Sequence, residues 1–518
     1  MPGSLCRRHD DKNAGMLDER TPILVGAGQL TQRDVDPAAA KEPLAMMEHV
    51  ARCAAADAGL TDRVLAQLDH IAVVNILAWS SANAPGHLAH RLGAHPRQLI
   101  YTAVGGNTPQ WLVNETAARI AAGQTRFALL AGAEGMYTLA RARRARVSLQ
   151  WTSGEPSGQI EPTVIGSDRP GTNDYEMAHG LTVPTTIYPL FENALRAHYG
   201  LSLEQHRRRL AELCHSFSRV AATNPYAWFR EERSADEIAT VSVQNRMIGF
   251  PYPKYMNSIL DVDQSAAVLM TSVAAAREMG IHPSKWVYLW GCGDAHDIWY
   301  VSERTDWHSS PAIRAAGQRA LQQAGLSIAD IASFDLYSCF PSAVQIARDM
   351  LGIPGDDPRP LTVTGGLPYH GGPGNNYVMH SVATMIEKLR QQPGTKGLVT
   401  GLGWYITKHS VGIYGSDAPP KPFSRHDPAL DQASIEAMPR TPLVHAANGR
   451  GAVETYTVLH DRDGAPMRGL IVGRMDDGSR FLANTSADRE VLEGLEREEA
   501  IGKVGSVSSR DGTNVFDI

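Results

Sequence analysis

The sequence predicts an α/β fold made of two similar halves, and three observations predict it. Short apolar runs typical of buried strands alternate with segments whose apolar residues recur at helical spacing. One strand–helix–strand pattern occurs early in the chain and again much later. Near the end, a proline-rich stretch is followed by alternating apolar and polar residues, a pattern typical of a small antiparallel β domain.

The elements follow in order along the chain. We expect a buried strand at 21–27 and an alanine-rich helix at 44–59, where Gly59 suits the end of the helix. Further strands are expected at 71–77, 126–133 and 287–291. The repeated unit is a helix at 108–122 with a strand at 127–131, matched downstream by a helix at 377–389 with a strand at 397–399. Each helix follows a Gly-Asn pair, so the repeat predicts a duplicated fold.

These patterns also predict domain boundaries. We expect a disordered tail at 1–20, a first half at 21–275 and a second half at 276–417. A loop domain at about 147–256, with helices at 184–199 and 203–222, is inserted into the first half. A linker and a β domain occupy 418–518, with strands at 451–459, 469–475 and 480–484. We expect the charged stretch from Asp488 onward to be only partly ordered.

Composition excludes several classes of protein. The chain has 518 residues, 43% hydrophobic and 20% charged, as in an ordinary globular protein of about three domains. A net charge of −6 argues against a nucleic-acid partner. The longest apolar stretches are too short to span a bilayer, and no secretory signal is recognisable. Five scattered cysteines without a CxxC pair predict no metal site and favour a cytoplasmic location.

Six segments together resemble the thiolase superfamily. They are 106–136, which ends in LLAGAEGM, NPYA at 224–227, DVDQSAAVLM at 261–270, YSCF at 337–340, GGLPYHGGPG at 365–374 and TGLG at 400–403. In order and spacing they are most similar to the sterol-carrier-protein type of thiolase and to thiolase-like proteins of type 1. The resemblance covers about residues 21–415. It implies a layered α-β-α-β-α fold and a coenzyme A (CoA) thioester as ligand.

The resemblance also implies where the chemistry lies, and it shows departures. The thiolase nucleophile is a cysteine at a helix N-terminus, and Gly106 stands at that position. The histidine of the thiolase GHP motif is replaced by Gly372, and Tyr337 stands where the sterol-carrier-protein type has the histidine of HDCF. Catalytic candidates are therefore Tyr337, Cys339 and His370. Candidates for binding CoA are Gly106, Asn107, Thr108, Gly371 and Gly403.

Several of these residues also suit plain structural roles. Asn107 can cap the helix that follows, with Gln110 completing a capping box. Cys339 can be a small buried hydrophobic residue, and Tyr337 a core aromatic.

Three functions stay open. The first is an acyl-CoA-binding protein of the acetyl-CoA acetyltransferase type, in lipid metabolism, with little or no thiolysis because nucleophile and base are replaced. The second is a CoA-ester aldolase that uses Tyr337, with the fused segment 451–484 as an OB-like domain. The third is a partner-binding scaffold without catalysis. Since thiolases are usually dimers, the resemblance implies a homodimer; a monomer is the alternative, because the added domain could block that interface.

Overall fold

A computed structural model of the chain describes residues 17–518; the first sixteen residues of the expected tail lie outside the described part. The main sheet has ten strands in the order β10-β11-β12-β9-β1-β8-β4-β2-β3-β5. Their bounds are β1 Pro22–Thr31, β2 His70–Val73, β3 Gln98–Thr102, β4 Phe127–Gly135, β5 Thr163–Ile165, β8 Asp263–Ser272, β9 Val287–His296, β10 Ser333–Asp335, β11 Lys396–Gly403 and β12 Lys408–Gly415. Residues 17–20 lead into β1, where the Glu19 carbonyl accepts from the amide of Ala274.

The duplication predicted from the sequence is visible in the strand order. In the first half, β2 pairs in parallel with β4, β4 antiparallel with β8, and β8 antiparallel with β1. In the second half, β10, β11, β12 and β9 repeat the same three pairings in the same order. A short antiparallel contact between β1 and β9 joins the halves. The α/β fold with two similar halves is therefore confirmed.

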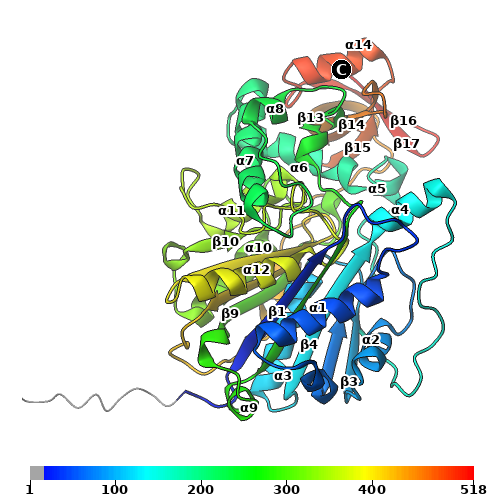
Figure 1. Cartoon of the computed structure of the whole chain (residues 1–518). Coiled ribbons are helices and arrows are strands. Elements are labelled where there is room, and N and C mark those ends of the chain that lie inside the picture. The colour runs from blue at the N-terminus through cyan, green and yellow to red at the C-terminus, as the bar shows by residue number, and fades with distance from the viewer. Residues whose placement is uncertain (1–16) are drawn as a thin grey trace, which may run out of the picture.

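The helices make the layers around this sheet (Figure 1). Two central helices, α3 (Thr108–Ala121) and α12 (Tyr377–Gln391), pack on each other and on strands of both halves. Helices α1 (Pro43–Asp57) and α2 (Ala84–Leu92) cover the outer face of the first half, and α10 (Pro311–Ala324) covers that of the second, beside α11 (Pro341–Leu351). The central helices are buried on almost every side, so their N-terminal ends open into the interior of the protein.

The segment between β4 and β8 carries most of the irregular structure. It contains α4 Met136–Ala145, β5, α5 Asp174–Ala178, α6 Pro184–His198, α7 Leu203–Thr223, α8 Ala235–Ala239, β6 Met247–Gly249 and β7 Tyr252–Pro253. Helix α9 (Val273–Glu278) follows β8. Elsewhere in the chain, short 3₁₀ helices lie at η1 Asp62–Gln67, η2 Lys254–Met256, η3 Pro283–Lys285, η4 Val301–Glu303 and η5 Ile328–Asp330. Strand β5 runs parallel to β3 and occupies that edge of the main sheet.

The C-terminal region forms a closed barrel of five strands. After α13 (Pro428–Glu436) come β13 Gly449–His460, β14 Pro466–Met475, β15 Arg480–Asn484, α14 Arg489–Arg497, β16 Val504–Arg510 and β17 Thr513–Asp517. The order β14-β15-β17-β16-β13 closes because β13 also pairs with β14. The expectation of partial order from Asp488 onward was wrong, because α14, β16 and β17 complete the barrel, with Val507 and Phe516 buried in its core.

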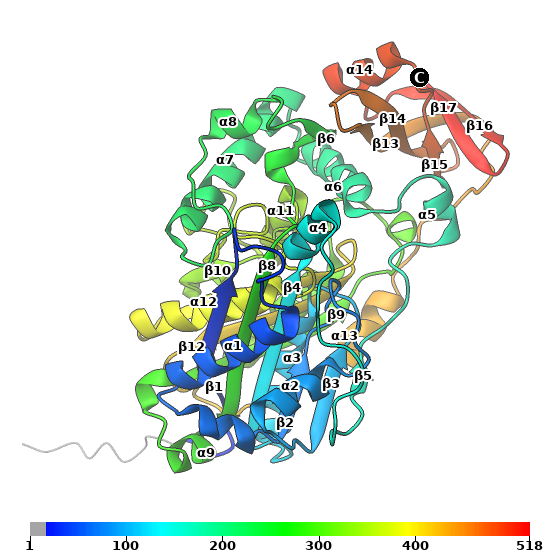
Figure 2. The same ribbon diagram turned by 45° about the vertical axis from the view of Figure 1, so that its right-hand side comes forward.

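The barrel is docked on the α/β body, against α5 and α6 (Figure 2). Strand β6 pairs with β13, so the inserted segment extends the barrel sheet. The buried guanidinium of Arg480 donates to the carbonyls of Ser302 and Arg304 in the body and forms an ion pair with Glu454 on β13. The barrel and the body are therefore joined by buried contacts, and Leu470, Val472 and Leu482 of the barrel belong to the same hydrophobic core as the body. Among the described residues, no helix combines the length and the apolar character that a membrane crossing requires.

Candidate functional site

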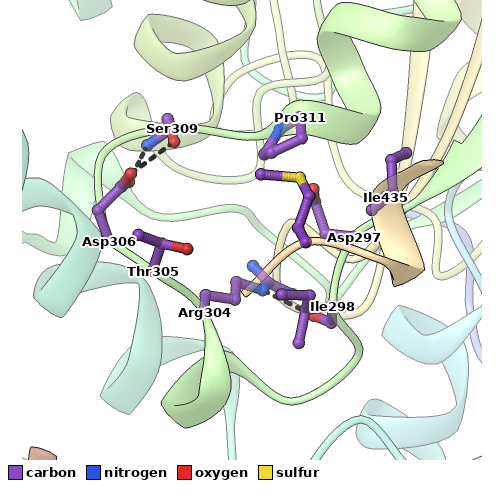
Figure 3. Close-up of a pocket in the computed structure, with 9 residues that line it drawn as sticks. Asp297, Ile298, Arg304, Thr305, Asp306, Ser309, Pro311 and Ile435 are labelled. Carbon is purple, nitrogen blue, oxygen red and sulfur yellow. Dashed lines mark hydrogen bonds between the residues drawn. The ribbon is translucent and has the colours of Figure 1, made fainter. Parts of the chain in front are cut away.

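Among the cavities in the described part of the chain, two differ in whether the polar groups of their walls already have partners. One, of about 120 Å³, lies between α13 and the loop before α10 (Figure 3). Its charged groups are already engaged: Asp297 accepts hydrogen bonds at the start of α10, and Arg304 donates to the carbonyls of Ile298 and Tyr405. It is also smaller than typical ligand cavities, which begin at roughly 300 Å³. We therefore do not assign a ligand to it.

The other cavity, of about 480 Å³, lies at the N-terminal end of α3 and is mostly apolar. Its wall consists of Val104, Gly105, Gly106, Val183, Pro184, Thr185, Tyr188, Asn257, Ser258, Leu260, Tyr337, Cys339, Phe340, Leu367, Gly374, Asn375, Leu402, Trp404 and Tyr405. Three of the residues predicted from the sequence meet here, namely Gly106, Tyr337 and Cys339. An apolar cavity with a few polar groups at a helix N-terminus has the character of a small-molecule site.

The start of α3 is built by backbone geometry and by one residue of the second half. The Thr108 hydroxyl donates to the Gly105 carbonyl at 2.7 Å, and the Gly105 amide donates to Oδ1 of Asn375 at 2.9 Å. Asn107 stands at the N-cap, but its side chain makes no capping hydrogen bond, so the predicted capping box with Gln110 is wrong. Gln110 instead donates to Asn114 inside the helix layer.

Gly106 and Tyr337 fit each other closely. A Cβ atom built on Gly106 would lie 2.3 Å from the Tyr337 hydroxyl and 2.5 Å from the Leu402 carbonyl oxygen. Both distances are far below van der Waals contact, and the carbonyl belongs to strand β11 and cannot move aside. The phenol of Tyr337 thus fills the space that a side chain at position 106 would occupy.

The two ionisable groups predicted in YSCF are both neutral at physiological pH. Burial raises the pKa of the Cys339 thiol to about 12, and the neighbouring Tyr188 and the backbone at Phe340 offset only part of this shift. Burial also raises the pKa of Tyr337 well above its usual value. Cys339 is 9% exposed and Tyr337 8% exposed, so both side chains line the cavity but are largely shielded from solvent. Tyr337 is available as a proton donor rather than as a base.

His370 does not line the cavity. The side chain is fully buried (0% exposed), and burial lowers its pKa to about 4. Its ring packs edge-on against Tyr377 and His380, with ring centroids 5.8 Å and 5.0 Å away. A neutral imidazole in this position has no direct path to a ligand in the cavity.

The loop after His370 approaches the cavity through its glycines. Gly371 adopts a φ of +110° and packs against Gln264, and a Cβ on Gly372 would lie 2.5 Å from Oγ of Ser258. Ser258 lines the cavity, as does Gly374 from the end of the same loop. The loop therefore forms the outer side of the wall, while Gly371 and Gly372 themselves lie behind it.

Behind Gly374 lies a buried carboxylate. Glu134, from the AEGM segment, accepts hydrogen bonds from the amides of Leu77 and Ala78 at 2.6 Å and 3.0 Å. Burial raises its pKa to about 7. A Cβ on Gly374 would lie 2.4 Å from Oε1 of Glu134, so the glycine lets this carboxylate hold the 75–78 loop close to the wall.

The turn between β11 and β12 supplies wall residues that the sequence did not reveal. Trp404 has a φ of +56° and Ile406 one of +53°, a conformation that bulky residues rarely adopt. The Trp404 carbonyl accepts from the Tyr188 hydroxyl at 2.8 Å, which holds the turn in place. Gly403 lies just behind the turn against Asn107 and Lys408. In the sequence, only the glycine-rich segment TGLG, directly before Trp404, indicated a turn at this place.

No group of three metal-ligating side chains occurs within residues 17–518. The side chains that line the cavity offer phenols, a thiol, two amides and the hydroxyls of Thr185 and Ser258. These groups suit binding and proton donation.

Comparisons with known proteins agree with this fold. A family profile described as the thiolase-like protein type 1 additional C-terminal domain matches residues 431–513. The crystal structure of a monomeric SCP2-thiolase-like protein type 1 from Mycobacterium smegmatis is 37% identical in sequence. It superposes with a TM-score of 0.84, over 97% of this chain and 100% of that one.

More distant structures share the fold alone. An Ltp2–ChsH2(DUF35) aldolase is 19% identical over 78% of this chain and 99% of that one, with a TM-score of 0.58. An acetyl-CoA acetyltransferase from Syntrophomonas wolfei is 16% identical over 77% of this chain and 99% of that one, with a TM-score of 0.53. The 3-ketoacyl-CoA thiolase of Salmonella newport (strain SL254) is 28% identical over 158 residues, which are 28% of this chain. The match spans only 34% of that thiolase.

Proposed function

Because the chain belongs to the SCP2-thiolase-like proteins of type 1, we propose that it binds a CoA thioester in the 480 Å³ cavity without forming an acyl-enzyme. The apolar wall suits an acyl chain, and the N-terminal end of α3 suits the thioester carbonyl, because backbone N–H groups and the helix dipole favour a partly negative oxygen.

The contact between Gly106 and Tyr337 carries this proposal. Covalent acyl transfer needs a nucleophile, and glycine offers none. The Tyr337 hydroxyl lies 2.3 Å from the position of a Cβ atom on Gly106, so the site is built around the missing side chain. This complementarity supports a stable noncovalent site.

The remaining candidates do not replace the nucleophile and its base. A thiol with a pKa near 12 is almost entirely protonated at neutral pH, and the thiolate is the reactive form. His370 is fully buried outside the cavity wall, so it does not reach the Cys339 thiol as a base. Thiolysis through Cys339 is therefore disfavoured.

Retro-aldol cleavage of a β-hydroxyacyl-CoA is the second candidate, and the position of Tyr337 favours it. Its phenol faces the cavity, stays protonated, and can donate a hydrogen bond to a carbonyl or enolate oxygen. The fold shared with an Ltp2–ChsH2(DUF35) aldolase adds support at the level of architecture only.

The proposal extends to the C-terminal barrel, the oligomeric state and the location of the protein. We propose that the C-terminal barrel is OB-like, as its five closed strands suggest, and that it serves as a structural part of the body. A monomer is favoured over a homodimer, because the Mycobacterium smegmatis relative is described as monomeric. We also propose a cytoplasmic location and a role in lipid metabolism, since CoA thioesters are intermediates of that metabolism.

Calorimetry with CoA and butyryl-CoA, combined with a thiolysis assay on acetoacetyl-CoA, tests the proposal. We expect binding of the thioester and no CoA-dependent cleavage. Rapid thiolysis by the purified chain would overturn the noncovalent mechanism. Cleavage of a 3-hydroxyacyl-CoA by the wild type that is lost in Tyr337→Phe would establish the aldolase instead, and a chain that binds no CoA thioester would leave the scaffold function.

A further inference from the structure

The wall of the 480 Å³ cavity contains two asparagine side chains, and they differ in how far their hydrogen bonds are satisfied. In Asn375, Oδ1 accepts from the amide of Gly105, and Nδ2 donates to the carbonyl oxygen of Asn75. In Asn257, Nδ2 donates to the carbonyl oxygen of Pro253 at 2.8 Å, but Oδ1 accepts no hydrogen bond from any described residue. Asn257 therefore brings an unused acceptor to the wall.

This acceptor cannot exchange places with the nitrogen of its own amide. The carbonyl oxygen of Pro253 needs a donor, which fixes Nδ2 on that side and leaves Oδ1 as the free end of the side chain. Asn257 is only 8% exposed, so bulk water does not hydrate the oxygen. A buried acceptor without a partner lowers the stability of the fold, and such an atom calls for a bound water molecule or a ligand.

The backbone holds Asn257 beside a group already assigned to the site. The amide of the next residue, Ser258, donates to the carbonyl oxygen of Cys339 at 3.2 Å. Leu260, which also lines the cavity, is 54% exposed and marks the open side. The segment 257–260 thus runs along the wall from the neighbourhood of Cys339 to the solvent, with Asn257 at its inner end.

A neutral donor is the ligand group that fits this acceptor. Among the residues that line the cavity none carries a charge, so an ammonium group would enter without a counter-charge. A hydroxyl donates one hydrogen bond and accepts others. Two lining groups can donate in return, because the hydroxyl of Tyr337 and the indole N–H of Trp404 have no acceptor among the described residues. A hydroxyl therefore matches the polar groups of this wall.

An amide N–H is the other neutral donor, and the pantetheine arm of CoA carries such groups. That arm has to leave the cavity through its open side, near Leu260, to reach solvent. Asn257 lies at the inner end of the same segment, where the acyl chain is the part of the ligand that remains. The acyl chain is therefore the source of the donor that Asn257 lacks.

We propose that Asn257 selects acyl groups that carry a hydroxyl, an assignment that rests on the proposed binding of a CoA thioester. The hydroxyl of the ligand donates to Oδ1 and supplies the partner that the protein does not provide. An unsubstituted acyl chain that covers the oxygen shuts out water without offering a donor, which weakens its binding. The preference concerns binding, so it holds whether the thioester is only bound or is also cleaved.

The test compares butyryl-CoA with 3-hydroxybutyryl-CoA and 4-hydroxybutyryl-CoA, which differ only in the hydroxyl and its position. Calorimetry gives each affinity for the wild type, Asn257→Ala and Asn257→Leu, and chromatography of the same samples shows whether a thioester was cleaved. Asn193→Ala is the matched control. Asn193 is also buried, donates to the carbonyl oxygen of Tyr456 and leaves Oδ1 without a partner within residues 17–518, but it does not line the cavity.

We expect at least one hydroxylated thioester to bind the wild type about tenfold more tightly than butyryl-CoA. In both Asn257 variants this ratio should fall to within about twofold, because butyryl-CoA binds as before or more tightly. Asn193→Ala should keep the ratio of the wild type.

Three results would overturn the role of Asn257 while leaving the proposed function intact. They are no preference for a hydroxyl in the wild type, a preference that survives in the Asn257 variants, and an equal loss of preference in Asn193→Ala. A wild type that binds none of the three thioesters would instead refute the proposed function.

Discussion

Replacing Gly106 by alanine tests the steric fit at the centre of the proposed site. The added methyl group would lie 2.3 Å from the Tyr337 hydroxyl and 2.5 Å from the Leu402 carbonyl oxygen. Overpacking of a well-packed interior costs about 1–3 kcal/mol. We expect Gly106→Ala to lower the free energy of unfolding by that amount, and to weaken butyryl-CoA binding because Tyr337 must shift into the cavity.

A double-mutant cycle assigns the cost to Tyr337. Among residues 17–518 the Tyr337 hydroxyl has no hydrogen-bond partner, so Tyr337→Phe alone should change stability little. In the Tyr337→Phe background the 2.3 Å contact disappears and the contact with Leu402 remains. The cost of Gly106→Ala should therefore fall by about 0.5 kcal/mol or more without vanishing. Urea unfolding followed by tryptophan fluorescence measures all four chains.

Gly494 on α14 provides the matched control. A Cβ there meets nothing within 4 Å, so Gly494→Ala should be neutral or stabilise the helix by up to about 1 kcal/mol. The reasoning fails if Gly106→Ala is as harmless as Gly494→Ala. It also fails if the effects of Gly106→Ala and Tyr337→Phe simply add, since the tyrosine would then not be the group that excludes a side chain.

Three further predictions follow from burial and charge. Burial raises the pKa of Cys339 to about 12, so the fraction of reactive thiolate should keep rising up to pH 10. The rate of Cys339 alkylation by iodoacetamide, measured by mass spectrometry, should rise with it; a plateau of the rate below pH 9 would contradict this. The pKa of His370 is about 4 in the folded chain and near 6.5 when unfolded, so the unfolded chain binds more protons between these values. The free energy of unfolding should therefore fall as the pH drops from 6.5 to 4. His370→Gln should remove up to about 3 kcal/mol of that fall, measured by urea titration at each pH. An unchanged pH dependence in His370→Gln would show that burial of His370 is not its cause. Arg480→Met leaves the buried carbonyls of Ser302 and Arg304 without their donor, while Glu454 keeps its ion pair with Arg474; this change should destabilise the chain by about 2–5 kcal/mol and expose the barrel to limited proteolysis. The partly exposed Arg474→Met should cost no more than about 1 kcal/mol; equal effects would show that the barrel is not anchored through Arg480.

Much of the fold could be predicted because each element has its own local signal. The strand at 21–27 and the helix at 44–59 have the periodicities that β1 and α1 need to bury their apolar faces. The repeated Gly-Asn pairs mark the starts of α3 and α12 correctly. The segment from Asp488 gave a weaker signal, since α14 buries only Leu492 and Leu495 and the short strands β16 and β17 bury little more. Those strands are fixed by backbone pairing within the barrel.

The sequence by itself determined the duplicated α/β body, the added barrel and the absence of a cysteine at position 106, because these depend on local periodicity and on residue identity. Only the tertiary structure decided what stands around that glycine. Tyr337 and Leu402 come from the second half of the chain and reach Gly106 across the contact between the halves.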